Sequence, residues 1–126
     1  MATINALTNY AENRVIDWVT TGSGQKYLAL FTGAIGDTGT GTEVNGTWYA
    51  RQPINFGAAV NSVAYNSNVL QFGKVTGSAL TITHWALFDA TTGGNAWIHG
   101  NFTDLQVSSP GNNVLVQVGD IAVSAD

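Results

Sequence analysis

The pattern of apolar and polar residues along the chain changes its period near Gly24. Between residues 9 and 20, apolar side chains recur at the spacing of an α-helix and form one stripe. The stripe consists of Ala11, Val15, Trp18 and Val19. Asn9, with Glu12 three residues later, matches the capping box that begins many helices. The pattern therefore predicts a helix over residues 9–20 whose Trp18 packs onto a sheet.

After Gly24 the pattern is typical of strands. Residues 27–32 are apolar on both faces, as in a buried strand. A polar, Gly-rich loop over residues 33–46 comes next, and we expect it to be flexible. Further short runs, bounded by Gly, Asn or Pro, follow at 47–52, 54–57, 60–65, 68–72, 79–88, 95–102, 105–108 and 114–124. This spacing predicts an all-β chain: residues 1–126 form a single β-sandwich or jelly roll of about eight strands with one N-terminal α-helix.

Two five-residue segments of the chain resemble each other. Tyr27-Leu-Ala-Leu-Phe31 is matched by His84-Trp-Ala-Leu-Phe88, and a turn rich in Gly and Thr follows each. A small alanine between bulky neighbours suits strands that pack closely in a core. We interpret the two segments as core strands with similar surroundings.

Composition supports this fold and excludes several classes of function. Only 10% of the residues are charged, against 44% that are hydrophobic, and the net charge is −4. The four Lys and Arg are far apart in the sequence, which argues against nucleic acid as a partner. No apolar run approaches the ~18 residues of a membrane span, and the first residues do not match a signal peptide. The chain has no cysteine, so disulfides cannot stabilise it.

The loop segment 36–43 is the first place to look for ligand chemistry. Its Gly and Thr residues do not match a phosphate-binding motif. Asp37 and Glu43 with nearby hydroxyls leave a weak calcium site as an alternative, without the dense carboxylates of an EF-hand. The favoured interpretation is a connection between strands.

The sequence offers little for catalysis. A zinc site would need both histidines, His84 and His99, together with Asp89 or Asp104. Each histidine is more simply interpreted as a strand residue at an interface or on a half-buried face. No G-x-S-x-G motif surrounds a serine, and the acidic residues mostly lie in turns. We therefore expect no enzyme activity, no metal and no cofactor.

Aromatic residues are the candidates for contact with a partner, as an interface or as platforms for sugars. Trp85 and Trp97 lie in apolar runs and are expected in the core. Trp48 and Tyr49 are adjacent, so a regular strand over 47–52 would send them to opposite faces and expose one of them. The candidate interface residues are Trp48, Tyr49, Asp37 and Glu43.

Several segments, taken in order, resemble a known family. They are Asn9–Asn13, Tyr27–Thr32, Asp37–Glu43, Tyr49–Gln52 with Phe56, and Thr83–Ala90 with Thr92–Asn95. In this order they resemble a family of small virion proteins of tailed bacteriophages. Members are labelled tail fibre proteins, and in some phages they are thought to decorate the head. The resemblance covers roughly residues 8–122 and supplies no catalytic residues.

The resemblance implies a virion structural protein that is made in the host cytoplasm. The chain has no heptads or fibrous repeats, so we favour a capsid decoration (cement) protein that binds the major capsid protein. The alternative is a tail fibre or minor tail protein that contacts other tail proteins and binds the host surface. In either case we expect a homotrimer whose contacts involve residues 47–52 or 33–46 and rest on apolar burial rather than charge.

Overall fold

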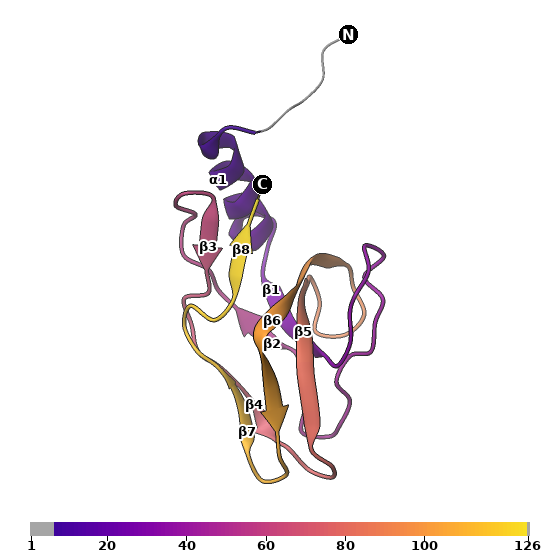
Figure 1. The fold of residues 1–126 in the computed structure, drawn as a ribbon. Coiled ribbons are helices and arrows are strands. Elements are labelled where there is room, and N and C mark those ends of the chain that lie inside the picture. The colour runs from indigo at the N-terminus through magenta and orange to yellow at the C-terminus, as the bar shows by residue number, and fades with distance from the viewer. Residues whose placement is uncertain (1–6, 126) are drawn as a thin grey trace.

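The computed structural model describes residues 7–125, except for the side chains of residues 104–107. A helical segment comes first and eight strands follow (Figure 1). The elements are α1 (Asn9–Asp17), the π-helical turn η1 (Trp18–Gly22), β1 (Lys26–Phe31), β2 (Gln52–Ile54), β3 (Val63–Tyr65), β4 (Leu70–Lys74), β5 (Leu80–Phe88), β6 (Ala96–Ser108), β7 (Asn113–Val116) and β8 (Ala122–Ser124). The predicted all-β fold of about eight strands with one N-terminal helix is confirmed. No helix in the described part of the chain is long and apolar enough to cross a membrane.

The strands form one larger sheet and two ribbons. The sheet has the order β2-β1-β5-β6, while β3 pairs with β8 and β4 pairs with β7. All these pairings are antiparallel. One face of the sheet meets the ribbons in a common core, in which Leu28 and Leu87 from the sheet join Phe72 of β4 and Val123 of β8. Burial of this apolar surface is the main force that holds the three groups of strands together.

The two similar segments are neighbouring strands. They form β1 and β5, and Ala29 lies directly opposite Ala86. Both alanines are fully buried, so the prediction of two core strands is confirmed. Ala29 and Ala86 belong to a second apolar cluster, separate from the common core. Their small side chains leave room for Ile35, which packs there with Phe31 and Phe88.

The segment 33–46 is folded onto the sheet, contrary to the expected flexible loop. The Thr32 N–H donates to the Thr42 carbonyl (3.1 Å), and the Val44 N–H donates to the Leu30 carbonyl (2.8 Å). Ile35 and Val44 are both buried. Two apolar residues nine positions apart match neither the helix nor the strand period, so the pattern did not reveal them.

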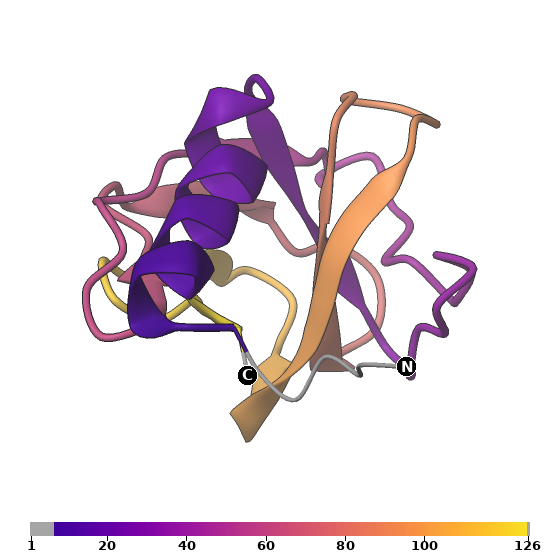
Figure 2. The same cartoon turned by 90° about the horizontal axis from the view of Figure 1, so that it is seen from above.

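The helix begins at Asn9, as predicted, but a different residue caps it and a different side is buried. The Thr8 hydroxyl, not Asn9, accepts a hydrogen bond from the Ala11 N–H (3.2 Å). The core side contains Ile16, which is 2% exposed, whereas Trp18 on the predicted stripe is 55% exposed. The helix lies beside β3 and β8 at one end of the molecule (Figure 1), and the view from above shows β5 and β6 to one side of it (Figure 2). The prediction that the Trp18 stripe would be buried on the sheet is therefore wrong.

Polar contacts explain why the helix turns this side inward. The Asn13 side-chain oxygen accepts a hydrogen bond from the Ser62 N–H (2.8 Å), and an Asp17 oxygen accepts one from the Ala59 N–H (2.7 Å). Ser62 has a φ of 65°, a conformation that non-glycine residues rarely adopt. These hydrogen bonds satisfy backbone donors of the segment before β3, and such pairing is not visible in hydrophobic periodicity.

Three predicted strands differ in the structure. Of the run 54–57, only Ile54 lies in a strand, the end of β2. Residues 47–51 form a turn and an extended connection, and only Gln52 of the run 47–52 lies in a strand. The separate run at 105–108 is the end of the long strand β6, whose register with β5 shifts between Ile82 and His84.

Candidate functional site

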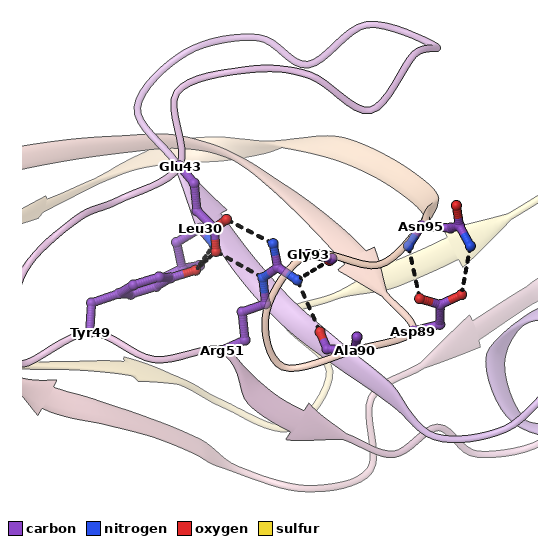
Figure 3. Close-up of polar contacts among 8 residues, drawn as sticks. All are labelled: Leu30, Glu43, Tyr49, Arg51, Asp89, Ala90, Gly93 and Asn95. Atoms are coloured by element: carbon purple, nitrogen blue, oxygen red, sulfur yellow. Dashed lines mark hydrogen bonds and ion pairs between the residues drawn. The ribbon is translucent and has the colours of Figure 1, made fainter.

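Three segments distant in sequence meet around Arg51 (Figure 3). Its guanidinium makes two parallel hydrogen bonds to the carboxylate of Glu43, from Nε to Oε2 and from Nη2 to Oε1, each 2.9 Å long. The Arg51 side chain is 7% exposed. A bidentate pair of this kind is both stronger and more directional than a single contact.

The same carboxylate binds Tyr49. The Tyr49 hydroxyl donates to Glu43 Oε2 (2.6 Å) and accepts from the Leu30 N–H (3.1 Å). Its ring stacks on Phe72 of the core, with the centroids 5.8 Å apart. Glu43 and Tyr49 therefore join the end of the 33–46 segment to β1.

The remaining contacts of Arg51 reach the turn between β5 and β6. Nη1 donates to the carbonyls of Ala90 (3.0 Å) and Gly93 (2.8 Å). The guanidinium carbon lies 3.8 Å from the centroid of the Phe88 ring, which adds a cation–π contact. Through these contacts Arg51 connects its own segment, residues 47–51, to the end of the 33–46 segment and to the turn between β5 and β6.

The electrostatics of this network keep Glu43 ionised and Tyr49 neutral. Burial alone would raise the pKa of Glu43, but the hydrogen bonds from Arg51 and Tyr49 and the charge of Arg51 outweigh it and lower the pKa. Burial and the hydrogen bond to Glu43 raise the pKa of Tyr49 above its usual range. A carboxylate whose oxygens already accept three hydrogen bonds is poorly suited to act as a general base, so the network is structural in character.

The lowered pKa of Glu43 predicts a specific pH dependence. A carboxyl group whose pKa falls on folding stabilises the protein above its unfolded pKa, about 4.3 for Glu, and this contribution is lost as pH falls through the folded value. We expect Glu43→Gln to be less stable than the wild type at neutral pH, with the gap narrowing toward about pH 3. Urea unfolding of both proteins across this range measures the gap. A gap that stays constant with pH would contradict the assignment.

A second polar cluster lies at the start of β6. An Asp89 oxygen accepts a hydrogen bond from the Asn95 N–H (2.8 Å), and the other accepts one from the Trp97 indole N–H (3.1 Å). These hydrogen bonds lower the pKa of Asp89. Lys26 also contacts Trp97: its Nζ lies 4.6 Å from the ring centroid and donates to the Ser23 hydroxyl and the Gly24 carbonyl. Lys26 thereby satisfies groups at the end of the helical segment.

The structure brings together three of the four predicted interface residues. Trp48 and Tyr49 are both half-buried, and their rings contact edge to face with centroids 5.9 Å apart. They do not lie on a strand, so the predicted opposite orientation is wrong. Glu43 binds Tyr49, whereas Asp37 lies apart on the exposed part of the loop, 3.4 Å from His99 Nε2. An interface role for the four residues stays a prediction.

Two tryptophans predicted in the core have different environments. Trp85 is 6% exposed, as expected, but Trp97 is 36% exposed and contacts the exposed Trp18 ring at 5.3 Å. Sequence reasoning missed this exposed aromatic pair and the central place of Arg51. The Gly93-Gly94-Asn95 turn just before Trp97 was the available signal, because side chains beside a tight turn are often exposed.

The metal alternatives gain no support from the geometry. In the part of the chain that the structure describes, no three His, Asp or Glu side chains gather closely enough to hold a metal ion. His84 Nδ1 lies 2.7 Å from the Thr83 hydroxyl, and His99 lies near Asp37.

Comparison with known families places this geometry in context. A family model described as "Podophage GP4 fiber I protein gp80" matches residues 6–124, nearly the whole chain. No curated protein matches the chain. The match confirms the expected resemblance to a family of phage virion proteins. The chain belongs to the podophage GP4 fiber I protein gp80 family.

Proposed function

We propose that the protein is a non-enzymatic structural component of a phage fibre. The family match over residues 6–124 carries this proposal, because the family is described as a fibre protein. The observed network agrees with it: the paired charges at Arg51 hold loops together, and the Glu43 carboxylate already accepts three hydrogen bonds from Arg51 and Tyr49. The sequence alone favoured capsid decoration and kept a tail fibre as the alternative. The proposal reverses this preference, because the family description supports the fibre alternative and does not specifically support capsid decoration.

The surface most suited to contact with other virion proteins lies on the helical segment. Five of the ten large apolar residues exposed in the described part of the chain gather here. They are Leu7, Tyr10, Val15, Trp18 and the neighbouring Trp97. Tyr10 and Val15 lie on α1, Trp18 begins the turn η1, and Leu7 precedes the N-cap residue Thr8. Large apolar side chains exposed in one region commonly mark interaction sites.

This surface supports the proposed partners, the tail proteins of the same virion. Three charged side chains in the described part of the chain contact this apolar patch: the Arg14 guanidinium lies 5.9 Å from the Tyr10 ring centroid, while Lys26 and Asp89 contact Trp97. Attachment through it would rest mainly on apolar burial and resist salt.

A homotrimer also remains our expectation, and sedimentation of the purified protein at micromolar concentration checks it. A monomer under those conditions would contradict the trimer.

The proposed function predicts the behaviour of virions that lack the protein. We expect their heads to keep DNA normally while adsorption to host cells falls at least tenfold. Supplying the wild-type protein in trans restores adsorption, whereas the Tyr10→Ser/Trp18→Ser double variant is expected not to be incorporated. Tyr65→Ser, at an exposed tyrosine outside the patch, is the matched control. Fragile heads with unchanged adsorption would instead support capsid decoration.

A further inference from the structure

A cavity of about 250 Å³ opens beside the edge strand of the sheet. It lies between β6 on one side and β7 and β8 on the other, and no backbone pairing joins β6 to either strand among the pairs that the structure describes. Its lining includes Trp85, Asn101, Phe102, Thr103, Leu115 and Asp120. The cavity is separate from the Arg51 network and from the apolar patch on the helix.

Trp85 contributes its indole to the lining of this cavity. In the register of the sheet, Trp85 faces Gly100 of β6, and a Cβ atom at Gly100 would lie 2.7 Å from Cζ2 and 3.2 Å from Nε1 of the indole. The absence of a side chain at Gly100 therefore lets the indole lie against the edge strand and line the cavity. Trp85 is 6% exposed, and none of the hydrogen bonds between described residues involves its indole N–H.

A ligand in the cavity could offer this N–H an acceptor. Within the described residues, no fully buried side-chain nitrogen or oxygen lacks a partner, which agrees with an indole N–H that is in contact with solvent at the cavity wall. A nearly buried indole N–H without a protein acceptor loses a hydrogen bond unless water or a ligand supplies one. Its place on the cavity wall indicates where that acceptor would come from.

The other lining groups define the chemistry that fits. Asp120 uses one carboxylate oxygen to accept from the Gln117 N–H (2.8 Å), which leaves the other available. Asn101 and Thr103 add an amide and a hydroxyl, groups that both donate and accept. Phe102 and Leu115 provide apolar surface. A ring with hydroxyls on its rim and C–H groups on its face matches such a mixture of donors, acceptors and apolar contacts.

The size of the cavity and the charge of its lining limit which ligands it can hold. The volume lies below the ~300–1,000 Å³ of pockets for drug-sized molecules, so it suits a single small ring. The lining holds a carboxylate and no Lys or Arg, and the chain has a net charge of −4. An anionic ligand would be repelled.

We propose that this cavity binds one neutral sugar unit of a host-surface glycan. The proposal deepens the proposed fibre function and rests on it for the source of the ligand. A single unit held in so small a cavity should bind with a dissociation constant on the order of 1 mM. Several copies in one fibre would raise the overall avidity.

Titration with simple glycosides tests the proposal directly. The methyl glycosides of glucose, galactose, mannose, rhamnose and N-acetylglucosamine serve as probes, each followed by ¹H–¹⁵N NMR of the intact protein. We expect at least one probe to shift the Trp85 indole N–H signal saturably, with the signal assigned through Trp85→Phe. If none shifts this signal at about 50 mM, far above the expected constant, the proposal is overturned. Shifts confined to Trp18 and Trp97 would also overturn it.

Matched variants separate a specific site from a general effect. Asn101→Ala and Thr103→Val are expected to weaken binding at least tenfold, while Thr76→Val, at an exposed threonine outside the cavity, leaves it unchanged. Equal affinity in all three variants would contradict the site. Each variant's amide spectrum reports whether the fold is retained. A negative titration leaves the fibre proposal standing, because the adsorption of virions that lack the protein tests that proposal independently.

Discussion

Replacing Gly73 with alanine is expected to destabilise the protein by about 3 kcal/mol, at the upper end of the usual effect of overpacking. Gly73 lies in β4, where the segment that carries Trp48 crosses it. A Cβ atom at Gly73 would lie only 2.2 Å from the Trp48 carbonyl oxygen and 3.1 Å from its carbon. These are backbone atoms, so relief requires movement of the whole segment and with it the Tyr49 contacts to the core.

Urea unfolding of Gly73→Ala and Gly33→Ala measures this effect. Gly33 is the matched control, because a Cβ atom there would have no heavy atom within 4 Å and its φ is not in the left-handed range. We expect the control to differ from the wild type by less than about 1 kcal/mol. Similar stabilities for the two variants would show that the 47–51 segment does not cross β4 as described.

Replacing Arg51 with methionine is expected to cost about 2–3 kcal/mol, somewhat less than the loss of a fully buried ion pair. The change leaves Glu43 with one hydrogen-bonding partner and removes the donor to the Ala90 and Gly93 carbonyls. The partial exposure of Glu43, 28% for its side chain, reduces the effect because water can solvate the stranded carboxylate.

A double-mutant cycle with Glu43→Gln isolates the interaction of the pair. We expect the double variant to be less destabilised than the sum of the two single variants, because each single change already breaks the same contact. Lys74→Met, at an exposed lysine of β4, is the control for loss of a positive charge. Additive effects of the two changes would mean that the ion pair contributes nothing to stability.

The parts of the fold that could be predicted are those with a local signal. The continuous apolar run at residues 27–32 and its counterpart around Ala86 identified the central strands β1 and β5, because a strand buried on both faces has few alternatives. The orientation of the helix could not be predicted in the same way. It depends on hydrogen bonds from Asn13 and Asp17 to a distant segment, which override the apolar stripe.

The candidate site was predictable only in part, for a related reason. Glu43 and Tyr49 stood out in the sequence through residue type, but their contact depends on Arg51 and on the crossing of β4 at Gly73. Asp37 was grouped with them because it shares a loop, although the loop folds back over the sheet and separates it from them. The cavity beside Trp85 had no sequence signal, since its walls come from β5, β6, β7, β8 and the turn before β8, which meet only in the folded chain.

Localisation of the protein on intact virions tests the fibre assignment most directly. Gold-labelled antibody, viewed by electron microscopy, reports the position, and quantitative mass spectrometry against the major capsid protein reports the copy number. The account predicts label on fibres and no more than a few dozen copies in each particle. Label spread over the head shell, with hundreds of copies in each particle, would contradict it and restore the capsid decoration reading.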